Sequence, residues 1–120
     1  MDKIYEQTML FDFYGELLTE HQRSVYIDAV YNDLSLGEIA EERGISRQGV
    51  HDLIKRCDRI LRDYEGKLHL VERFAGAKEI VREIQRLSET VEKPKAAGEQ
   101  ELRHRLQRIG ELSKELLEEL

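Results

Sequence analysis

The most reactive side chains in this sequence are a lone cysteine and four scattered histidines. Cys57 and His51 are six residues apart, which places them on different faces of one helix, so they do not form a nucleophile–base pair. A single cysteine excludes an intramolecular disulfide and a zinc site built on a cysteine pair. The histidines lack metal-ligand spacing; they are His21, His51, His69 and His104. We therefore predict no catalytic residue, no metal, no cofactor and no small-molecule substrate.

A second group of polar residues indicates DNA binding. From Ser46 to Arg62 there are five cations and two carboxylates, so this stretch carries +3 although the whole chain carries −6. Arg47 and Gln48 stand near its start, and either side chain can form two hydrogen bonds to one base edge. Cations farther along are suited to phosphates, which give affinity without sequence information. The predicted DNA-binding residues are Ser46, Arg47, Gln48, His51, Asp52, Lys55, Arg56, Arg59 and Arg62.

The small and apolar residues around this stretch predict a helix-turn-helix over residues 36–57. Such a motif needs a small residue where its two helices cross, and a residue that accepts positive φ in the turn. The second helix must also return apolar side chains to the core. The residues that meet these requirements are Ala40, Gly44, Ile45, Val50 and Leu53. An ordinary helical hairpin capped by glycine is the alternative interpretation.

Capping signals predict the helices that position these residues. Capping boxes begin at Thr19 and Ser35, each followed three residues later by a glutamine or glutamate whose side chain can return the hydrogen bond. A first helix is predicted before them, over residues 2–18. Ser46 is predicted to cap the reading helix, which covers about residues 46–64.

The C-terminal half has the pattern of two amphipathic helices. Gly66 is predicted to mark a bend that ends a helix-turn-helix domain over residues 1–66. A long amphipathic helix follows over 67–90, then a linker over 91–98 that contains the only proline, then a last helix over 99–120. The predicted fold class is all-α: a helix-turn-helix core of about four helices followed by one or two long C-terminal helices.

The apolar stripe of the 67–90 helix requires a partner surface. The partner could be the helix-turn-helix core, the tail helix or a second subunit. Because DNA-binding helix-turn-helix proteins often dimerise, we predict a homodimer formed through the last two helices. The predicted interface residues are Leu70, Phe74, Ala77, Val81, Ile84 and Leu87.

Charge and hydropathy restrict the location and the partners. Residues 1–34 carry two cations and seven carboxylates, and residues 67–120 carry eleven of each, so any basic surface must be local. The N-terminus lacks the basic and apolar regions of a signal peptide. No stretch approaches the ~18 apolar residues of a membrane span. The sequence therefore predicts a cytoplasmic protein without a membrane partner.

Several of these segments resemble the promoter-recognition helix-turn-helix of bacterial sigma factors, the region-four domain. The similar segments are residues 18–23, 36–40 and 46–50. Within that superfamily, residues 5–87 resemble the YlxM family, most specifically over residues 11–19. The resemblance implies a small all-helical bacterial protein that binds DNA. It also implies an association with the signal recognition particle pathway, as a regulator of the particle's GTPase.

Two functions remain open at the level of the sequence. The first is a DNA-binding regulatory protein that uses the predicted reading helix. The second is an adaptor that binds protein or ribonucleoprotein, whose acidic residues 1–34 dock a basic partner such as a component of the signal recognition particle. The basic reading helix favours the first, and the acidic residues 1–34 favour the second. Asp52 weakens promoter-type recognition, because an aspartate that faces phosphates repels them. The alternative to phosphate contacts is a solvated helix face whose arginines pair with Asp58, Asp63 or Glu65.

Overall fold

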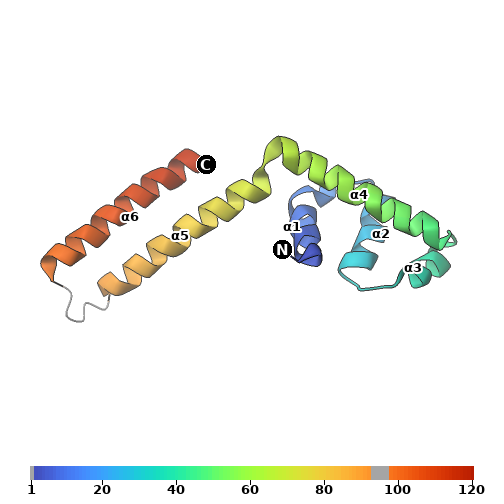
Figure 1. Ribbon diagram of the computed structural model, residues 1–120, viewed down its shortest axis with the longest axis horizontal. Coiled ribbons are helices and arrows are strands. Elements are labelled where there is room, and N and C mark those ends of the chain that lie inside the picture. Colours follow the sequence, from blue (N-terminus) through green and yellow to red (C-terminus); the bar gives the residue numbers. More distant parts are fainter. Residues whose placement is uncertain (1, 93–97) are drawn as a thin grey trace. The chain divides into compact units, whose positions relative to one another are not determined.

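The computed structural model describes residues 2–92 and 98–120 (Figure 1), so most of the predicted linker 91–98 lies outside the described residues. Every regular element in the described part of the chain is helical, which confirms the all-α fold class. The chain divides into two compact units, Met1–Val71 and Glu72–Leu120, here called unit 1 and unit 2. Unit 1 contains the whole of the predicted helix-turn-helix.

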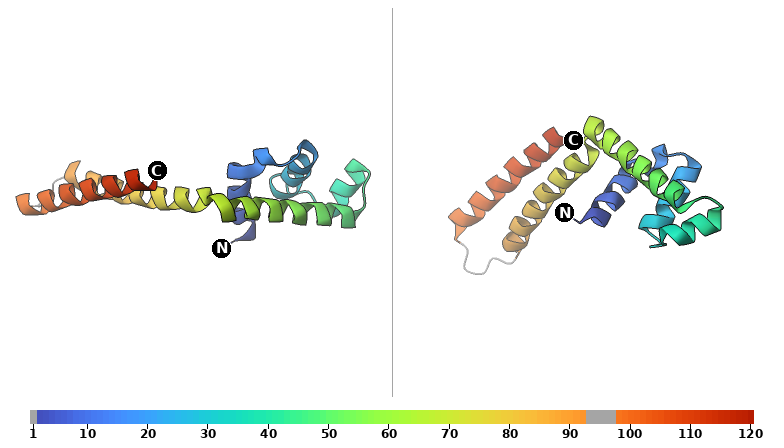
Figure 2. Two further views of the ribbon diagram at one scale, coloured as in Figure 1. Left: turned by 90° about the horizontal axis from the view of Figure 1, so that it is seen from above. Right: turned by 45° about the vertical axis from the view of Figure 1, so that its right-hand side comes forward.

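In unit 1, α4 packs against each of the other three α-helices (Figures 1 and 2). Thr19 and Ser35 begin α2 and α3 with the predicted capping boxes, in which the side chain of each accepts a hydrogen bond from the third residue of its helix. The elements are α1 (Lys3–Tyr14), the 3-10 helix η1 (Gly15–Leu17), α2 (Glu20–Val30), α3 (Leu36–Arg43) and α4 (Arg47–Leu68).

The first helix is shorter than the predicted 2–18. α1 ends at Tyr14, and the chain tightens into η1 instead of continuing as an α-helix to Leu18. Gly15 stands at this change because a Cβ there would lie 2.9 Å from the ring of Phe11. The 3-10 turn still brings Leu18 into the core, where it is buried.

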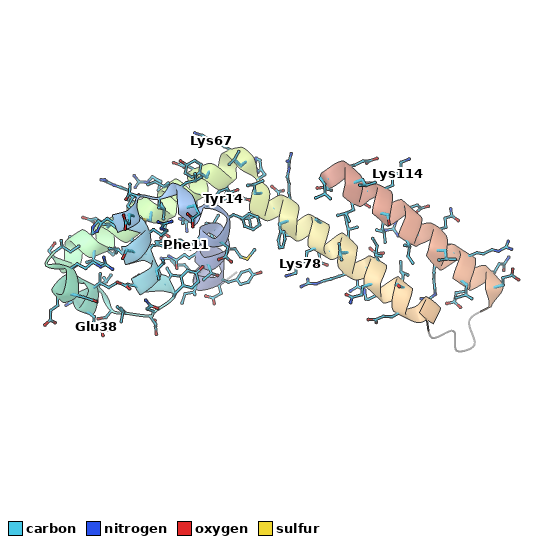
Figure 3. The ribbon with its side chains drawn as sticks, turned by 180° about the vertical axis from the view of Figure 1, so that it is seen from behind. Phe11, Tyr14, Glu38, Lys67, Lys78 and Lys114 are labelled. Carbon is cyan, nitrogen blue, oxygen red and sulfur yellow. The ribbon has the colours of Figure 1, made fainter. Side chains whose placement is uncertain are left out.

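Two apolar clusters hold α4 against the other helices. The larger joins α1, α2 and the middle of α4, and Figure 3 labels Phe11 and Tyr14 among the side chains between these helices. The smaller joins α2, α3 and the first turns of α4. The buried members are Leu10, Tyr14, Leu18, Tyr26, Cys57 and Leu61 in the first cluster, and Val25, Ile39, Ala40 and Val50 in the second.

A buried carboxylate lies beside the larger cluster. Asp58 is 7% exposed, and its Oδ1 accepts hydrogen bonds from the Tyr26 hydroxyl at 2.6 Å and from Gln7 Nε2 at 3.1 Å. Burial and the bond to Asp58 raise the pKa of Tyr26, so its hydroxyl remains a donor. The interpretation that Asp58 pairs with arginines of a solvated face is therefore wrong. Its position on the buried side of α4 directs it to partners on α1 and α2.

The helix does not bend at Gly66 as predicted; the break lies three residues later, at His69. α4 continues through Gly66 to Leu68, and the helix ends at His69, whose φ is 56°. Glycine at an exposed helical position costs only ~1 kcal/mol relative to alanine, so it does not end a helix whose other face is packed. The N–H of His69 donates to the carbonyl of Glu65 at 2.8 Å and closes the last turn.

Tyr14 and Glu65 determine how the next helix begins. The Tyr14 hydroxyl donates to Glu65 Oε1 at 2.5 Å and accepts from the backbone N–H of Leu70 at 3.1 Å. Glu65 Oε1 also accepts from the N–H of Val71 at 3.0 Å. Two orphan N–H groups at the start of α5 are thereby satisfied by side chains of α1 and α4.

Unit 2 is an antiparallel hairpin of α5 (Leu70–Glu92) and α6 (Glu99–Glu119), in which the helices lie side by side (Figures 1 and 2). Leu112 is its buried apolar residue, at 2% exposure. Arg108 Nε lies 3.5 Å from Glu83 Oε1 and links the two helices. α5 begins three residues later and ends two residues later than the predicted helix 67–90. None of the described helices has the length and hydropathy to cross a membrane.

Candidate nucleic-acid interface

The turn between α3 and α4 has the geometry that the helix-turn-helix prediction requires. Gly44 ends α3 at a φ of 68°, and its N–H donates to the carbonyl of Ala40. The N–H of Ile45 donates to the same carbonyl at 3.1 Å, which is the bond of a Schellman turn. Ser46 caps α4 as predicted, since its Oγ accepts from the N–H of Gly49 at 2.9 Å.

Not every predicted structural residue of the motif returns to the core. Ala40 and Val50 are buried and Leu53 is half-buried, but Ile45 is 37% exposed. The expectation for Ile45 is wrong because its backbone is held in the turn, before α4 begins to direct side chains inward. An ion pair braces α3 against α2 instead: Arg43 Nη2 lies 2.7 Å from Asp28 Oδ2. The hydrogen bond from Arg43 lowers the pKa of Asp28.

The predicted DNA-binding cations lie on the solvent side of α4. With 3.6 residues per turn, Gln48, Asp52, Lys55 and Arg59 form one stripe along α4, opposite the buried side chains. All four are exposed, and Arg47, Arg56 and Arg62 flank them as further exposed residues. Among the described residues, Arg62 has an ion-pair partner, Glu6 at 3.2 Å, and the other four cations have none.

Asp52 organises the polar groups in the first turns of α4. Its Oδ1 accepts a hydrogen bond from Gln48 Nε2 at 2.9 Å and lies 3.5 Å from His51 Nδ1. Arg47 lies toward α3, because a Cβ placed on Gly37 would be 3.7 Å from its Nε. The first turn of α4 therefore presents the Arg47 guanidinium beside α3. The Gln48 amide lies in the same turn and is already hydrogen-bonded to the Asp52 carboxylate.

Comparison with known proteins identifies the family of this chain. Residues 1–102 match the model of the UPF0122 family, described as "Putative helix-turn-helix protein, YlxM / p13 like". A UPF0122 protein of Halalkalibacterium halodurans is 47% identical over 100 residues, which cover 82% of this chain and 88% of the relative. A UPF0122 protein of Acetivibrio thermocellus is 51% identical over 84 residues, which cover 70% of this chain and 72% of the relative.

The chain belongs to the UPF0122 family. This confirms the resemblance to the YlxM family that the sequence indicated. The match to a helix-turn-helix family agrees with the geometry of α3, the Gly44 turn and α4. A helix-turn-helix is a binding scaffold, and the family description names no reaction.

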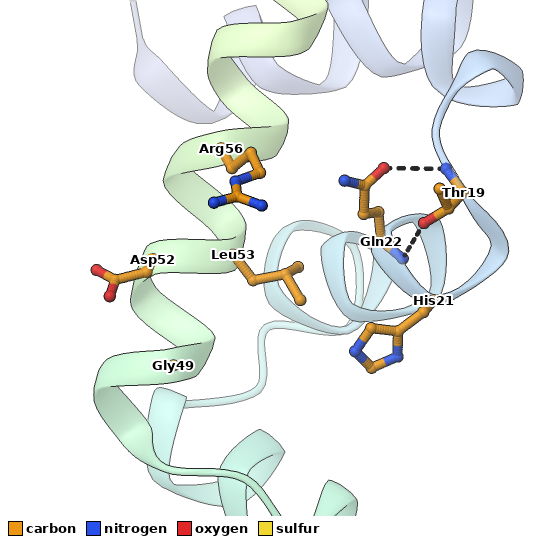
Figure 4. Close-up of a pocket in the computed structure, with 7 residues that line it drawn as sticks. All are labelled: Thr19, His21, Gln22, Gly49, Asp52, Leu53 and Arg56. Carbon is orange, nitrogen blue, oxygen red and sulfur yellow. Dashed lines mark hydrogen bonds between the residues drawn. The ribbon is translucent and has the colours of Figure 1, made fainter.

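A groove of about 390 Å³ flanks the exposed stripe of this UPF0122 protein, between the start of α2 and the first turns of α4 (Figure 4). Gly49, Asp52, Leu53 and Arg56 line it from α4. Thr19, His21 and Gln22 line it from the α2 side, where the capping box is formed (Figure 4). The sequence pattern did not include His21 in the candidate interface. Only the packing of α2 on α4 brings this residue there.

The remaining reactive groups of the UPF0122 protein are placed for packing. Cys57 is buried, and burial raises the pKa of its thiol to about 11, so the thiol is neutral and has no access to solvent. Over residues 2–92 and 98–120, no three histidine, cysteine, aspartate or glutamate side chains are grouped as metal ligands would be.

Proposed function

We propose that this UPF0122 protein is a DNA-binding regulatory protein that acts in the cytoplasm and reads DNA with α4. The observation that supports this most directly is the exposed stripe of α4 on a helix-turn-helix scaffold. Four exposed cations of the helix have no ion-pair partner among the described residues; they are Arg47, Lys55, Arg56 and Arg59. Unpaired exposed cations of one helix can replace the counterions of a phosphate backbone.

The proposed roles divide along α4. Arg47 and Gln48 lie in the first turn, the part of a recognition helix that contacts base edges in the major groove. Lys55 and Arg59 lie two and three turns farther on and are assigned to phosphates. Gln48 must exchange its bond to Asp52 for bonds to a base, so Asp52 opposes binding both by its charge and by its hydrogen bond.

The experiment that tests DNA binding is a fluorescence anisotropy titration of labelled mixed-sequence duplex across a salt series. We expect saturable binding whose logarithm falls linearly with the logarithm of the salt concentration, because counterions are released from the DNA. Sedimentation of the same samples is the control that distinguishes binding from aggregation. The absence of binding at about 50 mM salt would contradict the proposal.

A second candidate function is favoured by the acidic surface of η1, α2 and α3. Glu16, Glu20, Glu38, Glu41 and Glu42 are exposed on η1, α2 and α3. We propose as the alternative that this surface docks a basic protein or ribonucleoprotein, such as a component of the signal recognition particle, and regulates its GTPase. If duplex DNA does not bind, the same protein is added to the purified particle and its GTPase rate is measured. An unchanged rate would contradict the alternative.

We also propose a homodimer formed through α5 and α6. The predicted interface residues Phe74 and Val81 are each 48% exposed on α5, and Leu106 and Leu117 of α6 are 56% and 75% exposed. Burying such apolar area in a second copy would contribute roughly 25 cal/mol per Å². We expect light scattering behind a sizing column to give twice the chain's 14.1 kDa at tens of micromolar protein. A monomer mass would contradict the dimer, and a variant that ends at Lys93 tests whether α6 is required.

A further inference from the structure

A cation-lined cleft lies between the start of α1 and the middle of α4. Its volume is about 330 Å³. One lining residue comes from α1 and the others from α4, so segments far apart in the sequence form it together. The lining residues of this α1–α4 cleft are Lys3, Lys55, Asp58, Arg59, Arg62 and Asp63.

The charges of the cleft favour an anion. It has four cations and two carboxylates. The Asp58 carboxylate is buried and already accepts hydrogen bonds from Gln7 and Tyr26. Lys3, Lys55 and Arg59 have no ion-pair partner among the described residues. Cations that share a cleft repel one another, and a bound anion of two or three oxygens would relieve that repulsion.

We propose that the α1–α4 cleft binds a phosphate group, and that α1 therefore takes part in ligand binding through Lys3. Arginine offers a planar fork of N–H donors and lysine a point charge, and a phosphate can accept hydrogen bonds from both at once. If the phosphate belongs to DNA, the cleft proposal rests on the proposed DNA binding and adds a contact to it. A free phosphate compound is the other source of the same chemistry.

The position of the cleft along α4 specifies which part of a duplex it would contact. Arg59 follows Arg47 by twelve residues, which corresponds to ~18 Å along the helix axis. The major groove is ~12 Å wide. A phosphate in the cleft therefore lies beyond the groove that the first turn of α4 would enter, so α1 would extend the contact to a neighbouring stretch of backbone.

The test compares Lys3→Ala with Lys67→Ala in the anisotropy salt series. Both variants remove one exposed lysine from unit 1, but Lys67 lies on α4 outside the cleft. We expect Lys3→Ala to weaken binding several-fold and to lower the salt slope by about one, with Lys67→Ala near wild type. Glu6→Gln frees Arg62 from its ion pair and should strengthen binding.

The outcomes separate the cleft from the proposed function. If wild type binds duplex and the two lysine variants behave alike, the cleft proposal is overturned while DNA binding stands. If wild type does not bind duplex, DNA binding fails and a titration with inorganic pyrophosphate, followed by backbone amide NMR shifts, decides the cleft. Saturable shifts at Lys55 and Arg59 that disappear in Lys3→Ala support a phosphate from another source. Their absence overturns the proposal.

Discussion

Replacing Asp58 by alanine is expected to lower the free energy of unfolding of unit 1 by about 2–5 kcal/mol. The carboxylate accepts hydrogen bonds from Tyr26 on α2 and Gln7 on α1. Its removal leaves two buried donors without their acceptor, each at a cost of ~1–3 kcal/mol. Asp58→Asn keeps one oxygen for the Tyr26 hydroxyl and should lose less stability.

The measurement is urea unfolding followed by tyrosine fluorescence. All five tyrosines of the chain lie within residues 1–71 and there is no tryptophan, so this signal reports on unit 1 alone. Asp63→Ala is the matched control, because Asp63 is an exposed carboxylate on the same helix. Its effect should stay within ~0.5 kcal/mol. Equal midpoints for Asp58→Ala and Asp63→Ala would show that the buried carboxylate does not hold the three helices together.

The double variant Arg47→Ala/Lys55→Ala is expected to weaken duplex binding by roughly ten- to a hundredfold and to lower the salt slope by about one. Arg47 would lose contacts to a base edge from the first turn of α4. Lys55 would lose a phosphate contact two turns farther along α4. Both side chains are exposed, so the fold of unit 1 should not change.

The matched control for this prediction is Lys78→Ala/Lys114→Ala, which removes the same charge from α5 and α6 (Figure 3). Its affinity should remain that of wild type. Asp52→Asn provides a change of opposite sign, because it removes a negative charge near the phosphates and should strengthen binding. Binding that falls equally in both double variants would mean that only net charge matters and that α4 is not the reading helix.

The local features of the fold could be predicted from the sequence because each depends on a few neighbouring residues. The capping boxes at Thr19 and Ser35 and the left-handed Gly44 all stand where the pattern placed them. The same logic failed at Gly66, because the side chains of Tyr14 and Glu65 accept hydrogen bonds from the N–H groups that follow His69. The break between α4 and α5 depends on Tyr14, which lies more than fifty residues earlier.

The candidate site was predictable only in part, for the same physical reason. The exposure of Lys55 and Arg59 follows from helical periodicity. The burial of Asp58 does not, since periodicity alone cannot show that Gln7 and Tyr26 supply donors on the inner side of α4. Lys3 could not be associated with the cations of α4 either, because no spacing rule relates positions that only tertiary packing brings together.

The buried bonds of Asp58 have a consequence for the modularity of the motif. A helix-turn-helix is often treated as a cassette that can be transplanted, but here α4 forms side-chain hydrogen bonds with α1 and α2, outside the motif. A graft of residues 36–57 alone would leave those donors behind, and it would stop one residue before Asp58 itself. The transferable piece is therefore the whole of unit 1, in which the N-terminal helices orient α4.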